Sequence, residues 1–277
     1  MATLRRRLSK PQYIYRPTQL IRRATVRGSE PVVETPWGCP LQISQDDVIG
    51  AGIARTGIHE LGVSETMWRL TGRQDLAIDV GANIGYFTGL LASRAAEVVA
   101  FEPNPQLQGR LTENIARWKQ ASRVRVDRRA VSRSDGVSIL RLPPDYRANY
   151  GIATLEQTEQ STEDYEVETV RLDEIIDRPV GILKIDVEGH ELAVLEGTRL
   201  ANVRDIFFEE HQPLPSPASR LLESAGFIIH GIEELLTKPV LVNHTPKGWY
   251  APTYLATRDP GRVSRVMSPR GWHCLRG

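Results

Sequence analysis

Cysteine is scarce in this sequence, whose 277 residues include only Cys39 and Cys274. The two cysteines lie far apart, and neither stands at the cysteine or histidine spacing of a zinc site, so the sequence predicts neither a disulfide framework nor a structural metal site. Disulfides are typical of oxidising compartments, and their absence leaves a reducing compartment as the expected location. We therefore predict a cytoplasmic protein.

Long apolar runs are also missing. No segment approaches the roughly 18 consecutive apolar residues that a membrane-spanning helix needs. No apolar segment of about 7 to 15 residues follows the N-terminal arginines, as it would in a secretory signal. Hydrophobic residues make up 40% and charged residues 25% of the chain, which argues against a disordered, collagen-like or coiled-coil protein. We expect a globular protein without a membrane span.

Acidic residues are absent from residues 1–28, which contain eight basic ones: Arg5, Arg6, Arg7, Lys10, Arg16, Arg22, Arg23 and Arg27. Because the whole chain has a formal net charge of only +1, the remainder is mildly acidic. Such a basic arm attracts any polyanion, including nucleic acid, an anionic membrane face or the protein's own acidic surface. We favour a solvated or self-docked arm, although a mitochondrial transit peptide has a similar composition.

The pattern of apolar segments changes along the chain. Residues 29–70 carry prolines and glycines between short apolar segments and predict an N-terminal cap or lid. From residue 71 to 258, short apolar runs alternate with polar helical stretches, which is typical of an α/β domain with a mostly parallel sheet. We expect seven strands with helices on both faces, a substrate loop at residues 143–164 and a basic C-terminal tail at residues 259–277.

The strongest local motif is Asp79-Val80-Gly81-Ala82-Asn83-Ile84-Gly85, between a predicted strand and a predicted helix, with Glu102 at the end of the next strand. The glycines let backbone amides approach a ligand, and an acid one strand away can accept hydrogen bonds from both hydroxyls of a ribose. The glycine spacing differs from the Gly-x-Gly-x-x-Gly of dinucleotide sites, and Asp79 suits a ligand with an ammonium group. These features predict an S-adenosylmethionine pocket.

Three blocks of the sequence resemble the FkbM-type methyltransferase family. They are Asp79-Val80-Gly81-Ala82-Asn83-Ile84-Gly85-Tyr86-Phe87-Thr88, Phe101-Glu102-Pro103-Asn104-Pro105 and Leu183-Lys184-Ile185-Asp186-Val187-Glu188-Gly189-His190-Glu191. The resemblance covers about residues 33–258 and implies a class I methyltransferase (Rossmann-like) fold, S-adenosyl-L-methionine as cofactor, and O-methylation of sugars, glycolipids or polyketide-type natural products. The sequence departs from the family at His190, where a small residue is more common, and at its Arg-rich ends.

The resemblance also implies roles for individual residues toward the cofactor. It places Asp79, Gly81, Asn83 and Gly85 at the methionine end with Thr88 as a neighbour, Glu102 at the ribose, and Ala130 and Val131 on the adenine side. Small apolar residues such as Ala130 and Val131 are equally ordinary in core packing.

Methyl transfer to a hydroxyl requires alignment of the two reactants and removal of a proton. Ligands of open α/β sheets bind at the carboxyl ends of the strands, which singles out Asp186 on the predicted central strand and Glu209 and His211 on the next one. We predict these three as catalytic residues, with His211 as the general base because an imidazole accepts protons near neutral pH. The alternative for His211 is a strand-end residue that is hydrogen-bonded to a loop.

Two further alternatives concern metal binding and the class of protein. Asp186, Glu188, Glu209 and His211 could gather around magnesium or calcium, but their spacing is not diagnostic and we predict no metal site. We expect an O-methyltransferase that acts on a small hydroxylated molecule, with N-methyl transfer as the alternative. A nicotinamide-dependent oxidoreductase fits the glycine pattern poorly. Non-catalytic nucleic-acid binding through the basic arm is disfavoured because the aromatic residues, 6% of the chain, are not interleaved with the basic ones.

Overall fold

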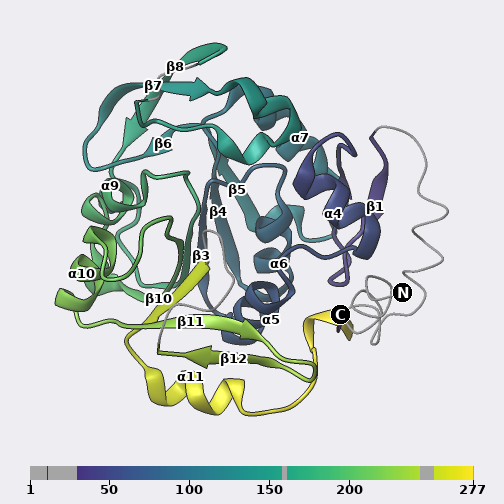
Figure 1. Ribbon diagram of the computed structural model, residues 1–277, viewed down its shortest axis with the longest axis vertical. Coiled ribbons are helices and arrows are strands. Elements are labelled where there is room, and N and C mark those ends of the chain that lie inside the picture. Colours follow the sequence, from purple (N-terminus) through teal and green to yellow (C-terminus); the bar gives the residue numbers. More distant parts are fainter. Residues whose placement is uncertain (1–10, 12–29, 158–160, 244–252, 277) are drawn as a thin grey trace.

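A computed structural model describes residues 11, 30–157, 161–243 and 253–276. The basic arm predicted at residues 1–28 lies outside this range apart from residue 11. The centre of the structure is an eight-stranded sheet with the order β12-β11-β13-β10-β9-β3-β4-β5 (Figure 1). Its strands are β3 (Leu76–Val80), β4 (Glu97–Phe101), β5 (Val124–Asp127), β9 (Val180–Ile185), β10 (Val203–Glu209), β11 (Ile228–Glu234), β12 (Pro239–Val242) and β13 (Thr253–Thr257).

The sheet confirms the expected mostly parallel α/β architecture. Strands β5, β4, β3, β9 and β10 pair in parallel. Strand β13 pairs antiparallel with both β10 and β11, and β12 pairs antiparallel with β11. The sheet has eight strands where seven were expected. The additional strand is β12, which returns along β11 and pairs its Leu241 with Ile232.

The strand order reverses in the middle of the sheet. From β3 the chain moves outward through β4 to β5, and it then returns to place β9 on the other side of β3. In open α/β sheets a crevice forms where the order reverses, outside the carboxyl ends of the strands, and ligands bind there. The topology therefore places a functional site at the carboxyl ends of β3, β4, β9 and β10.

Helices cover both faces of the sheet (Figure 1). Alternate strand residues enter opposite layers, as the two-residue period of a strand requires: Ile182 belongs to one hydrophobic cluster and Leu183 to the other. The first cluster includes buried residues of α4 (Val48–Thr56), α5 (Leu61–Leu70), α6 (Tyr86–Arg94), α7 (Pro105–Ala116) and α11 (Pro260–Met267). The second includes residues of α8 (Leu172–Ile175), α9 (Glu191–Glu196) and α10 (Pro217–Ser224). No helix in the described ranges combines the length and the apolar character that crossing a membrane requires.

The segment predicted as a cap, residues 29–70, contributes mainly to the first layer. It contains a two-stranded hairpin, β1 (Val32–Glu34) and β2 (Pro40–Gln42), followed by α4 and α5. Met67 and Leu70 of α5 are at most 1% exposed, and the Asn114 side chain of α7 accepts a hydrogen bond from the Gln42 backbone at 2.7 Å. Most of this segment is therefore integral to the core.

A second, three-stranded sheet has the order β6-β8-β7. It consists of β6 (Ala130–Val131), β7 (Gly136–Leu142) and β8 (Glu163–Val170). The predicted loop at residues 143–164 connects β7 to β8 and contains two short 3₁₀ helices, η2 (Pro144–Ala148) and η3 (Tyr150–Ile152). The small sheet and this loop lie beside α7 at one end of the main sheet (Figure 1).

The expectation of a basic C-terminal tail is wrong for the described residues up to 276. They form α11 and the 3₁₀ turn η5 (Cys274–Arg276), and Trp272 is completely buried. The buried carboxylate of Glu65 accepts hydrogen bonds from the backbone of His273 at 2.8 Å and Cys274 at 2.7 Å. A charge pattern alone could not indicate this packing, because its partner on α5 lies about two hundred residues earlier in the chain.

We expect Leu275→Ala to lower the free energy of unfolding by about 2 to 3 kcal/mol, because deleting buried methyl groups removes their transfer energy and leaves a cavity. Leu275 is 6% exposed and belongs to the first hydrophobic cluster. Urea unfolding measures the change. Ser264→Ala on the exposed face of α11 is the control and should stay within about 0.5 kcal/mol. Equal stability of the two variants would contradict the packing of this segment.

Candidate active site

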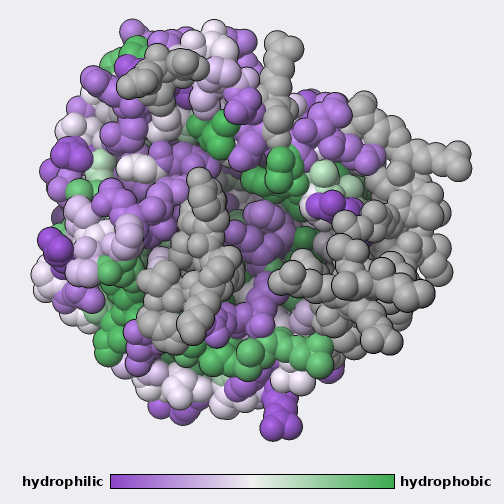
Figure 2. Space-filling model, viewed as in Figure 1, coloured by the Kyte–Doolittle hydropathy of each residue, from purple (hydrophilic) through white to green (hydrophobic). Residues whose placement is uncertain are grey.

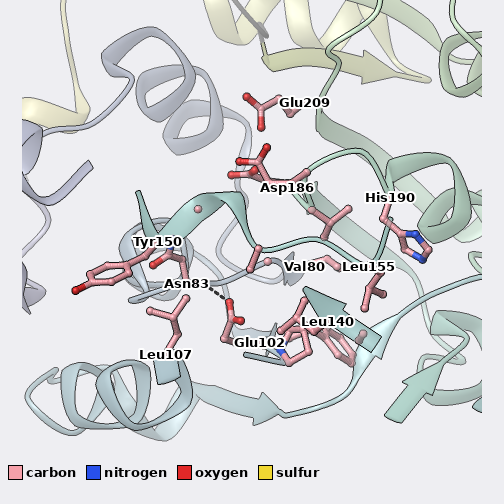
Figure 3. Close-up of a pocket in the computed structure, with 18 of the residues that line it drawn as sticks. Val80, Asn83, Glu102, Leu107, Leu140, Tyr150, Leu155, Asp186, His190 and Glu209 are labelled. Carbon is pink, nitrogen blue, oxygen red and sulfur yellow. Dashed lines mark hydrogen bonds between the residues drawn. The ribbon is translucent and has the colours of Figure 1, made fainter. Parts of the chain in front are cut away.

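A cavity opens where β3, β4, β9 and β10 end. It encloses about 1100 Å³ of space, part of it open to solvent. Figure 2 shows hydrophilic residues gathered at the centre of this face. Residues from the ends of the four strands line the cavity together with residues of β6, β7 and the loop between β7 and β8 (Figure 3). The predicted site residues that line it are Gly81, Asn83, Glu102, Ala130, Val131, Asp186 and Glu209.

The turn after β3 brings two strand ends into contact. Gly81 has a φ of +81°, and a Cβ atom at this position would collide with the carbonyl oxygen of Asp186. Glycine is therefore required twice, for its left-handed conformation and for the close approach of the backbone of β9. Gly85, with a φ of +96°, begins α6 instead, and a Cβ there would lie 2.9 Å from Leu111. Gly85 thus serves helix packing and does not line the cavity.

Glu102 is held by the backbone at the end of β4. It is 5% exposed, its Oε2 accepts from the amide of Asn83 at 2.7 Å and its Oε1 from the amide of Asn104 at 2.9 Å (Figure 3). Burial raises the pKa of Glu102 to about 7, although both backbone hydrogen bonds act to lower it. A carboxylate has about four lone-pair sites, so each oxygen can still accept a hydroxyl. This geometry is suited to gripping the two hydroxyls of a ribose.

Asp79 and Thr88 were predicted at the cofactor, but the structure does not place their side chains among the residues that line the cavity. Both are completely buried, and Asp79 Oδ2 accepts from Thr88 Oγ1 at 2.6 Å. Asp79 Oδ1 forms an ion pair with Lys184 Nζ at 3.1 Å. Lys184 also donates to the carbonyl of Gly81 at 3.0 Å. The charge of Asp79 is thus used inside the protein to support the turn.

An apolar wall stands beside Glu102. Ala130 and Val131 line the cavity there while they also belong to hydrophobic clusters. They are joined by four further apolar residues, namely Pro103, Leu107, Leu140 and Leu155. A flat aromatic base would bury its faces against such a wall, since burial of apolar surface is favourable. The adenine-side role of Ala130 and Val131 stays a prediction.

His190 connects the loop between β7 and β8 to the rest of the site. Its Nε2 lies 2.9 Å from Ser132 Oγ, and its Nδ1 lies 2.7 Å from Glu156 Oε1. The loop is further fixed by a hydrogen bond from Thr154 Oγ1 to the carbonyl of Glu188 at 2.8 Å. A small residue at position 190 could not make either side-chain contact. The departure from the family pattern therefore has a structural role, which is to hold the loop against the cavity.

Asp186 and Glu209 meet at the opposite end of the cavity from the apolar wall (Figure 3). Burial acts to raise the pKa of Asp186, but the charge of Lys184 and a hydrogen bond from Glu209 outweigh it and lower the pKa. Burial, the charge of Asp186 and the same hydrogen bond raise the pKa of Glu209. Glu209 therefore holds a proton more readily than Asp186, and Asp186, whose side chain is 41% exposed, is the more readily ionised of the two.

His211 lies next to the cavity but not among its lining residues. Strand β10 ends at Glu209, so the strand alternation that predicts a shared face for Glu209 and His211 no longer applies. His211 is exposed, and its Nε2 lies 3.6 Å from Glu188 Oε2 and 3.9 Å from Glu209 Oε2. Glu188, Glu209 and His211 offer ligand atoms within 4.8 Å of one another. Asp186, the fourth residue of the alternative cation site, is not part of this group.

Several polar residues in or beside the site were not predicted from the sequence. His59 and Glu60 precede α5, and Thr253 begins β13, so each reaches the cavity from a segment far from the motifs. No local pattern marks these three. Lys184 could have been found, because it places a positive charge within an otherwise apolar buried strand, and a buried charge requires a partner.

Comparisons with known proteins agree with this geometry. A family model described as the methyltransferase FkbM domain matches residues 79–229, more than half of the chain. A hexuronic acid methyltransferase, AglP, of Haloferax volcanii is 35% identical over 160 residues, which cover 54% of this chain and 62% of the relative. A 31-O-demethyl-FK506 methyltransferase, FkbM, of Streptomyces tacrolimicus is 32% identical over 172 residues, which cover 50% of this chain and 65% of the relative. The chain spans less than two thirds of the length of each of these two relatives.

A solved structure also resembles the chain. A methyltransferase FkbM from Methylobacillus flagellatus has a TM-score of 0.43 and 17% sequence identity, and the match covers 75% of this chain and 60% of that one.

Proposed function

The chain belongs to the FkbM methyltransferase family and has its class I α/β fold, and on this basis we propose that it transfers a methyl group from S-adenosylmethionine to a hydroxyl of a small molecule. A sugar, a glycoside or a polyketide-type natural product is the acceptor class we propose. The observation that carries the proposal is Glu102, a backbone-held carboxylate between a glycine turn and an apolar wall, with the ionised Asp186 at the other end of the same cavity.

The residues present fit the cofactor. Glu102 would hold the ribose hydroxyls, and the wall that includes Leu140 and Leu155 would cover the adenine. The turn at Gly81 and Asn83 would border the methionine end, because it lies between Glu102 and Asp186 in the cavity wall. When bound, the cofactor supplies a methyl group that its sulfonium activates for transfer. The protein's own task is then to align an acceptor and take its proton.

Asp186 is the group that takes this proton in the proposed reaction. Its pKa is lowered, it lines the cavity, and its Oδ2 forms an ion pair with Lys184 Nζ at 3.4 Å. Asp186 would accept the proton that the acceptor hydroxyl loses when it receives the methyl group. His211 becomes the less suitable base, since it lies outside the cavity lining. The proposal therefore gives the role of base to Asp186, just after β9, in place of His211, the base predicted from the sequence.

Glu102→Gln should weaken binding of S-adenosylhomocysteine by about 10- to 150-fold, because a hydrogen bond to a charged group contributes about 1.5 to 3 kcal/mol. Isothermal titration calorimetry measures the affinity. Glu166→Gln, which changes an exposed carboxylate on β8, is the control and should bind as the wild type does. Wild-type affinity in Glu102→Gln would remove Glu102 from the cofactor site.

The affinity for S-adenosylhomocysteine should also rise between pH 6 and pH 8. Burial raises the pKa of Glu102 to about 7, so below that pH the protonated carboxyl loses an acceptor site that the ribose needs. A ligand that prefers the ionised form binds more tightly as the pH increases through this pKa. The titration repeated at several pH values should show the rise in the wild type and a smaller rise in Glu102→Gln. Identical pH profiles would contradict this assignment.

A further inference from the structure

The end of the cavity away from the apolar wall is acidic. Besides Glu102, four carboxyl groups line the cavity: Glu60, Asp186, Glu188 and Glu209. They come from the segment before α5, from the turn after β9 and from the end of β10. Among the lining residues that the structure describes there is no lysine or arginine. An acceptor that enters here therefore meets several carboxyl groups and no basic side chain among the described lining residues.

Lys184, the cation beside Asp186, is already paired. It is 5% exposed, its Nζ donates to the carbonyl of Gly81 at 3.0 Å, and it forms ion pairs with Asp79 Oδ1 at 3.1 Å and Asp186 Oδ2 at 3.4 Å. Its charge is therefore shared between two carboxylates. Two imidazoles of the described residues also lie near the acids, His59 near Asp186 and His211 near Glu188.

Besides Glu209, two of the carboxyl groups at this end of the cavity have a raised pKa. Burial and the charges of Asp186 and Glu191 raise the pKa of Glu188 to about 7. Burial and, among other charges, that of Asp186 raise the pKa of Glu60. A cation placed among these groups would ionise them and gain charge-assisted hydrogen bonds, which are about twice as strong as neutral ones.

Building on the proposed methyl transfer, we propose that the acceptor carries a cationic amino group close to the hydroxyl that is methylated, as an amino sugar does, and that Glu188 and Glu209 bind this group beside Asp186. An ammonium group is donor-only and matches the acceptor-only oxygens of carboxylates. A carboxylate or phosphate on the acceptor would instead face acids without a cationic partner among the described lining residues, and such like-charge contacts are unfavourable. The acceptor class inferred here therefore differs in charge from a hexuronic acid.

The test uses the full-length protein saturated with S-adenosylhomocysteine, which lacks the positive sulfonium and so leaves the acidic end without that charge. Glucosamine, glucose and glucuronate are titrated into it by calorimetry, in two buffers of different ionisation enthalpy. We expect glucosamine to bind about tenfold more tightly than glucose, since one hydrogen bond to a charged group is worth at least that much. Glucuronate should bind most weakly, and glucosamine binding should release protons from Glu188 and Glu209 to the buffer.

Two variants test whether Glu188 causes the preference for glucosamine. Glu188→Gln should reduce the preference for glucosamine over glucose, whereas the remote exposed control Glu166→Gln should keep it. The proposal would be overturned if glucosamine bound no more tightly than glucose, or if neither sugar bound. Tighter binding of glucuronate than of glucosamine would also overturn it. Stoichiometric Mn²⁺ binding that Glu188→Gln abolishes would also overturn it, because a metal ion would then supply the missing charge. The preceding titration with S-adenosylhomocysteine tests the proposed function separately, since its failure would concern the cofactor site alone.

Discussion

Asp186→Asn should lower turnover by about 100- to 10,000-fold, the usual cost of removing a general base, while affinity for S-adenosylhomocysteine stays close to that of the wild type. The amide keeps the size of the side chain but cannot take a proton. The fold should tolerate the change, because Asp186 is partly exposed and Lys184 retains its ion pair with Asp79 at 3.1 Å. Transfer of a radiolabelled methyl group to hydroxylated sugars and amino sugars measures turnover, and calorimetry measures cofactor affinity.

His211→Ala is the matched comparison for this prediction. His211 lies outside the cavity lining, with its Nε2 near the carboxyl groups of Glu188 and Glu209, so its removal should change the rate by less than about tenfold, or about 1.4 kcal/mol. The reverse outcome, a severe loss in His211→Ala and a small one in Asp186→Asn, would return the role of base to His211. Wild-type rates in both variants would leave alignment alone as the source of catalysis.

Gly81→Ala should abolish detectable binding of S-adenosylhomocysteine and lower the free energy of unfolding by more than about 3 kcal/mol. The alanine would have to adopt a φ of +81°, and its Cβ would collide with the carbonyl oxygen of Asp186. Relief of the collision must separate the ends of β3 and β9, which carry Asn83 and Asp186 into the cavity. Thermal unfolding and cofactor titration measure the two effects.

Gly109→Ala is the control for Gly81→Ala. Gly109 lies within α7, and a Cβ there would have no heavy atom within 4 Å. Alanine is a better helix former than glycine by about 1 kcal/mol, so this variant should be slightly more stable than the wild type and should bind the cofactor normally. Normal cofactor binding in Gly81→Ala would contradict the role that we give to the turn.

Two parts of the site could be predicted from the sequence, because a local motif defines one and the end of a strand defines the other. The glycine turn and Glu102 are such parts, because a tight turn and an acid on the neighbouring strand have the same consequence wherever they occur in an open α/β sheet. The orientation of Asp79 could not be predicted in this way. Its buried position depends on an ion pair with Lys184 of β9. Lys184 also donates to the carbonyl of Gly81, which lies 103 residues earlier in the sequence.

Strand alternation and charge are weak guides where the chain leaves its regular structure. His211 follows the end of β10, and it stays outside the cavity lining although its Nε2 lies 3.9 Å from Glu209 Oε2. The Arg-rich C-terminal segment packs against the core because Trp272 fills it and Glu65 of α5 caps its backbone. In both cases the deciding contact is tertiary, and the nearby sequence carries no sign of it.

The central claim is that the cavity at the ends of β3, β4, β9 and β10 binds S-adenosylmethionine. Calorimetric titration of the full-length protein with S-adenosylhomocysteine, run in parallel with NAD, tests this claim most directly. The account predicts saturable binding of one S-adenosylhomocysteine per chain, lost in Gly81→Ala and weakened in Glu102→Gln, and no binding of NAD at the same concentrations. Binding of NAD without binding of S-adenosylhomocysteine would contradict it.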